Sequence, residues 1–340
     1  MEDSRWMDAQ LKAANDLVNA GSQALRQNQN AVGAAALREA DAILDMAEEE
    51  SDEVLKLRAR VSNELGVAHQ RLNRLEESLG YHGKAAEICN ELIERGENFE
   101  ANSAATHLNL SSIYIAMGKA AEALEAGEKA LTMIGLLRER EEPGVDALEL
   151  GANQNMAVIY AREKRYEASD AAMERSVELA RILAEAGQPN FQAQLAQGCQ
   201  QLSVILFDEE RFEHALRWGR DAEALSEKAF EAIGQPVLPV YVISQINLIS
   251  YNERLGRYAD AEDCLWKALD VAGNDAQILR RGYAFYDSCR KQADARLEEG
   301  NLPREEVDEG FEELNARIEK VGGMEAIQRA IEQAQQRGRR

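Results

Sequence analysis

Residues 108–131 read LNLSSIYIAMGKAAEALEAGEKAL, and this stretch decides the fold. It holds a first helical segment with a small residue at Ser111, a turn at Gly118, and a second segment in which Ala123 and Ala130 stand seven positions apart. A small side chain at a helix crossing lets two backbones approach closely, while larger Leu and Ile side chains fill the flanks. The stretch therefore predicts a packed pair of helices.

The same pattern recurs along the chain at a fixed spacing. Turn residues recur at intervals of 46 positions: Ala120, Tyr166, Phe212 and Tyr258. Leu75 stands 45 positions before the first of them. A constant period of this length indicates a repeat protein, in which each unit buries its apolar face against its neighbours.

Weaker copies of the pattern flank these repeats. We expect an N-terminal helix pair at about 8–26 and 32–49. A C-terminal pair is expected at about 275–299 and 304–320, with a closing helix after the glycines at 322–323. The sequence therefore predicts about seven antiparallel helix pairs and a C-terminal capping helix.

The repeats also suggest how the chain is divided. We expect a degenerate helix pair over 1–50, extended repeats over 51–272, and a degenerate repeat with a capping helix and short tail over 273–340. Proline cannot continue a preceding helix but can open the next one. Three prolines mark breaks between repeats: Pro143, Pro189 and Pro236.

The pattern of Ser111, Gly118, Ala123 and Ala130 resembles that of the tetratricopeptide repeat family. That family's usual unit is roughly 34 residues, and the longer unit here is similar to the extended repeats of kinesin light chain and related adaptors. The resemblance covers roughly residues 30–300. It implies an all-α, right-handed superhelical α-solenoid whose first helices line a concave groove. It also implies a protein–protein interaction adaptor that binds an extended peptide segment.

Amide side chains occupy one first-helix position in four consecutive repeats, which we call the amide ladder: Asn109, Asn155, Gln201 and Asn247. A carboxamide has both donor and acceptor groups, so a row of them can pair with the backbone of an extended peptide. Asn on the first helices does this in the adaptors that the chain resembles. Gln154 and Gln200 widen the polar stripe in the middle repeats. The alternative is that these amides bond to the next repeat and set the superhelix pitch.

Arginines follow the ladder seven residues later, at Arg162 and Arg254, and Arg71 lies at the equivalent place of an earlier repeat. Guanidinium groups facing a groove suit an acidic peptide or a carboxylate. The alternative is a basic residue favoured at a helix C-terminus. Asn63 also stands 46 positions before Asn109, but its register is shifted by one, so we do not assign it to the peptide-binding site.

Composition excludes several classes of partner. With 61 acidic and 39 basic residues, the formal net charge of −22 disfavours nucleic acid and anionic membranes. No apolar stretch is long enough to span a membrane. The four scattered cysteines fit reduced thiols in a cytoplasm. We therefore expect a cytoplasmic protein whose partner is another protein or peptide.

Motifs for catalysis, metal binding and cofactor binding are missing from the sequence. His69, His82 and His107 match inward packing positions, so we interpret them as core imidazoles rather than a zinc site. We expect no enzyme activity, no cofactor and no metal. Chaperone-binding members of that family have a carboxylate clamp, which needs a Lys four residues before the ladder position. This chain has no Lys there, so we do not expect it to bind a chaperone C-terminus.

Two hypotheses remain after this reading. The first is the peptide-binding adaptor. The second is a structural or self-assembling scaffold, a homo-oligomer, in which the ladder only sets the pitch. Aromatic residues near the last repeat bear on the second: Trp266, Tyr283, Phe285 and Tyr286. They pack beneath the cap, or else they form an exposed patch for a second copy.

Overall fold

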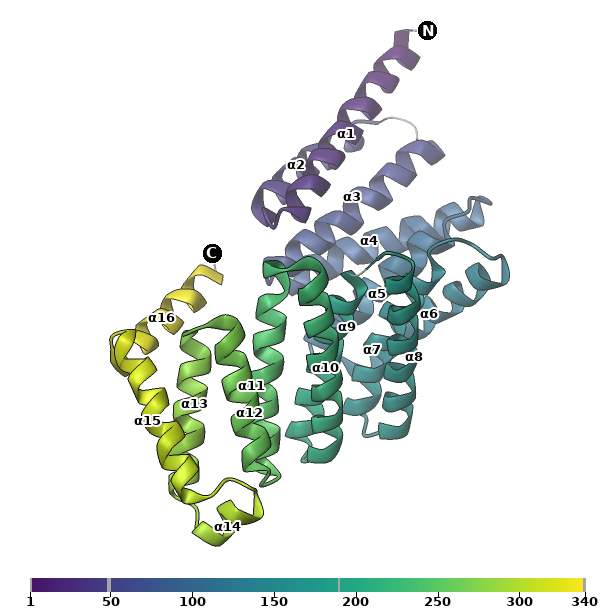
Figure 1. Ribbon diagram of the computed structural model, residues 1–340. Coiled ribbons are helices and arrows are strands. Elements are labelled where there is room, and N and C mark those ends of the chain that lie inside the picture. The colour runs from purple at the N-terminus through teal and green to yellow at the C-terminus, as the bar shows by residue number, and fades with distance from the viewer. Residues whose placement is uncertain (1, 48–49, 189, 339–340) are drawn as a thin grey trace. The chain divides into compact units, whose positions relative to one another are not determined.

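The computed structural model describes residues 2–47, 50–188 and 190–338. Within these ranges every regular element is a helix and no strand is present. The chain packs as two compact units, residues 1–179 and 180–340. The predicted all-α solenoid of helix pairs is therefore confirmed (Figure 1).

The first unit consists of consecutive helix pairs, in which α1 packs on α2, α3 on α4 and α5 on α6. The unit boundary falls within its last helix. Its helices are α1 (Glu2–Arg26), α2 (Asn30–Asp45), α3 (Asp52–Arg71), α4 (Leu75–Glu94), α5 (Glu100–Ala116), α6 (Ala120–Glu139), α7 (Val145–Arg162) and α8 (Tyr166–Glu185).

The second unit continues the pairing, with α9 packed on α10 and α11 on α12. Its elements are α9 (Asn190–Asp208), α10 (Phe212–Ile233), the 3-10 helix η1 (Gln235–Val237), α11 (Leu238–Arg254), α12 (Tyr258–Ala272), α13 (Ala276–Arg290), α14 (Asp294–Glu299), α15 (Arg304–Lys320) and α16 (Gly323–Gly338).

The predicted turn residues mark real helix starts. Each of the five is the first residue of a second helix: Leu75, Ala120, Tyr166, Phe212 and Tyr258. Two positions earlier, the backbone has a left-handed φ of 57–74° in every repeat: Asn73, Gly118, Lys164, Glu210 and Gly256. This conformation ends the first helix and reverses the chain. The 46-residue period therefore reflects one turn geometry, repeated.

The small residues lie where the two helices of a repeat cross. Ala123, Ala130, Ala215 and Ala222 are completely buried. In three repeats a serine hydroxyl donates across the crossing to a carbonyl oxygen twelve residues away: Ser78 to Gly66, Ser111 to Ala123 and Ser169 to Ala157, at 2.7, 3.0 and 2.8 Å. Small side chains thus allow both the close approach and a hydrogen bond that fixes it.

The C-terminal repeat corrects one prediction. Instead of one helix over 275–299, α13 ends at Arg290 and the separate α14 follows. The Arg304 guanidinium donates to the carbonyl oxygens of Arg290 at 3.2 Å and Gln292 at 2.6 Å. These carbonyl groups therefore have a partner without a continuing helix. The break also turns α14 so that Leu297 is completely buried.

Two other predictions touch residues outside the described ranges. The second N-terminal helix, expected to reach 49, ends at Asp45, and residues 48–49 are not described. Pro189 is likewise outside those ranges. Pro143 precedes α7 and Pro236 lies in η1, so both stand between helices as predicted.

The aromatic residues of the last repeat pack beneath the C-terminal helices. Phe285 and Tyr286 are completely buried, and Trp266 and Tyr283 are partly buried against the same core. The Tyr286 hydroxyl donates to Glu262 Oε1 at 2.5 Å and accepts from Trp266 Nε1 at 3.1 Å. The interpretation of these residues as core is confirmed. The alternative, that Phe285 and Tyr286 belong to an exposed patch, is wrong because both are buried.

The left-handed turn predicts a stabilising substitution. Glu210 has φ 59° and an exposed side chain, whereas Gly118 and Gly256 fill the equivalent position in two other repeats. Glu210→Gly should raise the free energy of unfolding by about 0.5–1 kcal/mol, because glycine has no Cβ to strain there. Urea denaturation measures this. The control Gln197→Gly replaces an exposed residue inside α9 and should be destabilising. A loss of stability in Glu210→Gly as well would contradict the argument.

The packing of α15 predicts the opposite effect for another glycine. A Cβ at Gly310 would overlap the Tyr286 hydroxyl and lie 2.7 Å from Glu262 Oε1. Gly310→Ala should cost about 1–3 kcal/mol through overpacking. A Cβ at Gly135, within α6, meets nothing within 4 Å. Gly135→Ala should therefore stabilise by about 0.5–1 kcal/mol. Thermal denaturation measures both variants. Equal changes in stability for Gly310→Ala and Gly135→Ala would refute the packing argument.

Candidate functional site

The first rung of the amide ladder bonds to the preceding repeat. Asn109 Nδ2 donates to Asn63 Oδ1 at 3.1 Å, and Asn63 Oδ1 lies 2.9 Å from His82 Nδ1. Asn63 thus belongs with the ladder, although its shifted register left it out of the predicted site. The signal that could have found it was its 46-residue distance from Asn109.

The second rung is also used inside the first unit. Asn155 Nδ2 donates to the backbone carbonyl of Leu108 at 3.0 Å, which joins α7 to α5. Gln154 beside it is buried. In this unit the ladder amides therefore connect neighbouring first helices.

The second unit treats its ladder amides differently. Gln200 is buried and donates to the Val240 carbonyl at 2.5 Å and to Ser244 Oγ at 2.6 Å, which joins α9 to α11. Gln201 is exposed and Asn247 is half-buried. Neither of these two side chains makes a hydrogen bond within the described ranges.

Two of the three predicted arginines complete helix ends. Arg71 Nη1 donates to the Leu25 carbonyl at 2.6 Å, and Arg162 Nη1 donates to the Ile115 carbonyl at 2.5 Å. Both acceptors belong to the last turn of the preceding first helix, and each also accepts a backbone N–H of the following turn, from Asn28 and Gly118 at 3.1 Å. Arg254 differs, because its guanidinium lies 5.1 Å from the centre of the Phe212 ring.

A continuous strip of side chains runs along α9 and α11, which pack against each other. Positions at helical spacing lie on one face, so Ile243, Asn247 and Arg254 follow one another along α11. On α9, Gln201 lies at the position that matches Asn247, and Val204 follows it three residues later. Ile243 is 45% exposed and Val204 is 42% exposed, which is unusual for these side chains. We call Gln201, Val204, Ile243, Asn247 and Arg254 the unit-2 strip.

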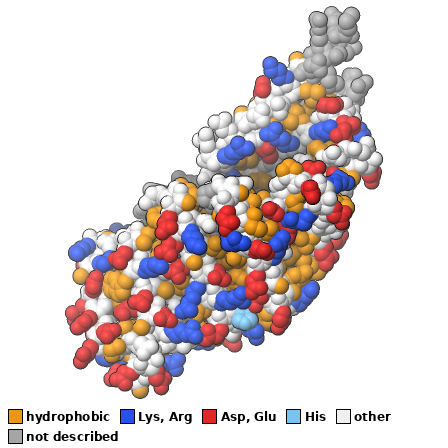
Figure 2. All heavy atoms as spheres, turned by 45° about the vertical axis from the view of Figure 1, so that its right-hand side comes forward, with side chains coloured by type: hydrophobic (Ala, Val, Ile, Leu, Met, Phe, Trp, Pro, Cys, Tyr) orange, Lys and Arg blue, Asp and Glu red, His pale blue; other side chains and the backbone are white. Residues whose placement is uncertain are grey.

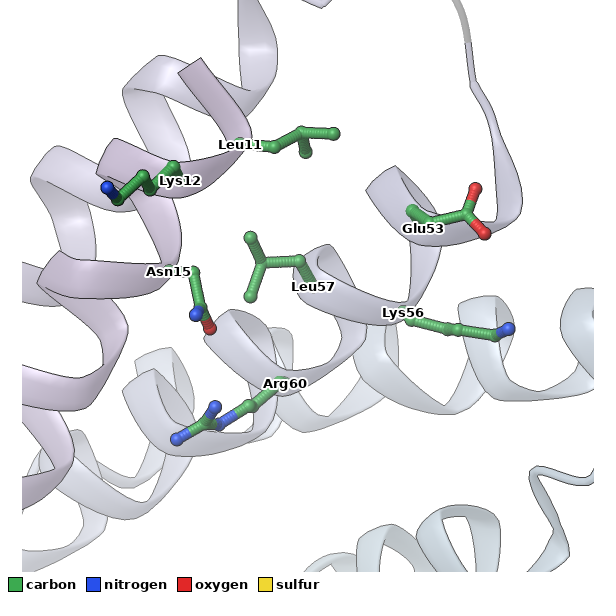
Figure 3. Close-up of a pocket in the computed structure, with 7 residues that line it drawn as sticks. All are labelled: Leu11, Lys12, Asn15, Glu53, Lys56, Leu57 and Arg60. Carbon is green, nitrogen blue, oxygen red and sulfur yellow. The ribbon is translucent and has the colours of Figure 1, made fainter. Parts of the chain in front are cut away.

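The first unit has a cavity of about 560 Å³ between α1 and α3. Leu11 and Leu57 point into it, and Lys12, Lys56 and Arg60 lie around it (Figure 3). Lys56 pairs with Glu97 at 2.8 Å and Arg60 with Glu64 at 3.1 Å, so two of the three cations already have carboxylate partners. None of the predicted site residues lines this cavity.

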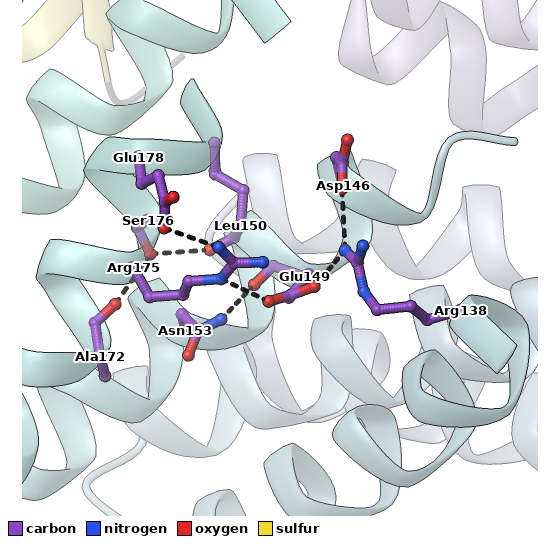
Figure 4. Close-up of polar contacts among 9 residues, drawn as sticks. All are labelled: Arg138, Asp146, Glu149, Leu150, Asn153, Ala172, Arg175, Ser176 and Glu178. Carbon is purple, nitrogen blue, oxygen red and sulfur yellow. Dashed lines mark hydrogen bonds and ion pairs between the residues drawn. The ribbon is translucent and has the colours of Figure 1, made fainter. Parts of the chain in front are cut away.

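An ion-pair network connects three helices of the first unit (Figure 4). Glu149 of α7 lies between Arg138 of α6 and Arg175 of α8, with its Oε1 2.7 Å from Arg175 Nε. Asp146 pairs with Arg138 at 2.8 Å. The hydrogen bond to Glu149 raises the pKa of the Arg175 guanidinium. Because all these cations are neutralised, we assign the network to structure rather than to ligand binding.

The three histidines are packing residues. His69, His82 and His107 are buried, and the His69 ring lies against the Tyr81 ring, tilted by 38° with ring centres 5.2 Å apart. Burial lowers the pKa of His82 to about 4 and lowers those of His69 and His107. In the part of the chain that the structure describes, no group of His, Cys, Asp and Glu residues could hold a metal ion.

The cysteines are unpaired, as the sequence suggested. Cys89, Cys199 and Cys289 are buried and Cys264 is half-buried. Burial raises the pKa of the Cys89 thiol to about 11, so it stays protonated near neutral pH.

Charges of both signs are mixed on the surface. On the face drawn in Figure 2, acidic and basic side chains alternate rather than gather in one patch. None of the described helices combines the length and hydrophobicity needed to cross a membrane.

Comparison with solved structures places the fold among helical repeat proteins. The apo form of RapI is 14% identical with a TM-score of 0.57, covering 92% of this chain and 78% of RapI. A Rap protein complexed with competence and sporulation factor is 12% identical with a TM-score of 0.50, covering 96% and 99%. A tetratricopeptide repeat protein from Parabacteroides merdae is 13% identical with a TM-score of 0.45, covering 89% and 99%.

The likeness to the two Rap structures shows the fold alone, and with the helix pairs described above it defines the chain as an all-α solenoid. A family model described as "Family of unknown function (DUF6483)" matches residues 37–319. The chain belongs to this family. A search of the curated proteins finds no significant match.

The buried His82 predicts a pH dependence of stability. Its pKa is about 4 in the folded chain against 6.5 ordinarily. The unfolded chain therefore binds more protons between these values, and the stabilisation present above pH 6.5 is lost as pH falls towards 4. The full loss is about 3 kcal/mol. Urea denaturation at a series of pH values should show this decline, shallower in His82→Gln; equal declines would contradict the assignment.

Proposed function

We propose that this protein is an interaction adaptor that binds an extended peptide segment of a partner protein along the unit-2 strip. The observation that carries the proposal is a pair of amides, the exposed Gln201 and the half-buried Asn247, which have no hydrogen-bond partners in the described chain. A cytoplasmic location and the absence of enzyme activity belong to the same proposal.

The chemistry of the strip suits a peptide backbone. Each carboxamide can accept from one backbone N–H and donate to one backbone C=O, whatever the side chains of the ligand. Val204 and Ile243 offer apolar contact beside the amides, and burying their exposed area would favour binding. Extended peptides expose both kinds of group, so they match the strip in polarity and form.

Similar proteins support the proposal only at the level of the fold. One of the similar solved structures is a Rap protein complexed with competence and sporulation factor. We infer by analogy that this chain also holds a partner. A closer kinship with the extended repeats of kinesin light chain is part of the same proposal.

The first unit favours the scaffold alternative. There Asn109, Asn155, Arg71 and Arg162 are used to connect one first helix to the preceding one. If the whole chain were a structural or self-assembling scaffold, these contacts would be its central feature. We therefore place peptide binding in the second unit and the pitch-setting role in the first.

The adaptor proposal predicts that substitutions in the strip weaken binding without unfolding the protein. Random short peptides displayed on phage are selected with the full chain, and the affinities of the selected peptides are measured by fluorescence anisotropy. Gln201→Ala with Asn247→Ala should weaken binding by about tenfold or more, since each amide loses hydrogen bonds worth about 1 kcal/mol.

Gln328→Ala is the matched control, because Gln328 is an exposed amide on α16 away from the strip. It should bind as the wild type does. Failure to select any peptide, or equal affinity in the strip and control variants, would favour the scaffold.

A further inference from the structure

A polar cavity of about 320 Å³ lies in the second unit, at the C-terminal end of α11. Three arginines line it: Arg254 of α11, Arg281 of α13 and Arg296 of α14. Glu253 is the only carboxylate in its lining. Glu299 also acts on Arg296, whose pKa it helps to raise, so three guanidinium groups face fewer carboxylates and leave a local excess of positive charge in a chain whose net charge is −22.

Each arginine is held by a contact that leaves other N–H groups unused. Arg281 Nε donates to Ser250 Oγ at 3.1 Å, and its Nη2 donates to Glu253 Oε2 at 2.5 Å. Arg296 Nε donates to the Tyr258 hydroxyl at 3.0 Å. A planar guanidinium has five N–H donors in a fixed fork, so both keep donors for a ligand.

Arg254 supplies an accessible group to the cavity. Its side chain is exposed and rests beside the Phe212 ring without a hydrogen bond to any described residue. A helix dipole favours a basic residue at the end of α11, but Arg281 lies inside α13, so that explanation does not cover the cluster. Like charges brought together cost energy unless an anion joins them.

We infer that this cavity binds an oxyanion group carried by the peptide ligand, either a phosphoryl group or a pair of neighbouring carboxylates. Both are negatively charged, and both accept hydrogen bonds from the forked N–H groups of arginine. The inference rests on the proposed function for its peptide. The cavity itself is a separate site and can be tested with free anions.

The position of the cavity fits the end of the strip. Arg254 stands seven residues after Asn247 on α11, a rise of roughly 10 Å. An extended peptide covers this distance with about three residues. The amides would therefore hold the peptide backbone while the arginines select an acidic or phosphorylated side chain about three positions along it.

Calorimetric titration of the full chain with inorganic phosphate, and separately with succinate, tests the cavity without a peptide. Arg254→Gln and Arg296→Gln should each weaken binding of the anion by about tenfold, since each removes charged hydrogen bonds. The matched control is Arg280→Gln, because Arg280 is exposed on α13 beside Arg281 and outside the cavity. It should bind as the wild type does.

The result separates the two sources of the oxyanion. Binding of phosphate alone points to a phosphorylated partner, and binding of succinate alone to paired carboxylates; either supports the inference. If neither anion binds, or if Arg280→Gln weakens binding as much as Arg254→Gln, the inference is overturned. The proposal for the cavity and the proposal for the unit-2 strip can fail separately. If no peptide is selected but the variant with Gln201→Ala and Asn247→Ala still binds the anion, the cavity is upheld and peptide binding along the strip is rejected.

Discussion

Close approach of the two helices in each repeat is the constraint on which the other features depend. It requires a small residue at the crossing, as at Ala123 and Ala215, and it leaves no room for alternatives, since both are completely buried. The left-handed turn before each second helix then fixes where the crossing falls. Because crossing and turn recur together, the repeats from α5 onwards present their first helices in the same register, and side chains 46 positions apart occupy matching places, whereas α3 is shifted by one residue.

The sequence predicted those parts of the fold that depend on steric fit alone. The helix starts at Tyr166 and Phe212 followed from the period, because a turn and a crossing each tolerate few residue types. The break between α13 and α14 could not be predicted, because the residue that permits it, Arg304, lies more than a turn beyond the break in sequence. The role of Asn63 could not be predicted either, because its register in the sequence is shifted by one residue. Its hydrogen bond with Asn109 is seen only when the helices are packed.

The candidate site was harder to predict than the fold. Matching positions do not imply matching roles: Asn109 and Asn155 bond to the preceding first helix, whereas Gln201 and Asn247 make no such bond. What differs is whether a neighbouring atom lies within reach, and neighbours are set by packing rather than by the residue itself. In the same way Arg162 and Arg254 share a sequence position, yet one reaches a backbone carbonyl and the other a phenyl ring.

The reach of Arg71 and Arg162 into the previous repeat has a consequence for how the first unit unfolds. The last turn of α1 is completed by a side chain of α3, and that of α5 by a side chain of α7. Fraying of either helix end therefore also breaks a hydrogen bond to the next first helix, which couples the opening of adjacent repeats. The amide protons of these helix ends should accordingly exchange with solvent as members of a shared cooperative block, rather than one repeat at a time.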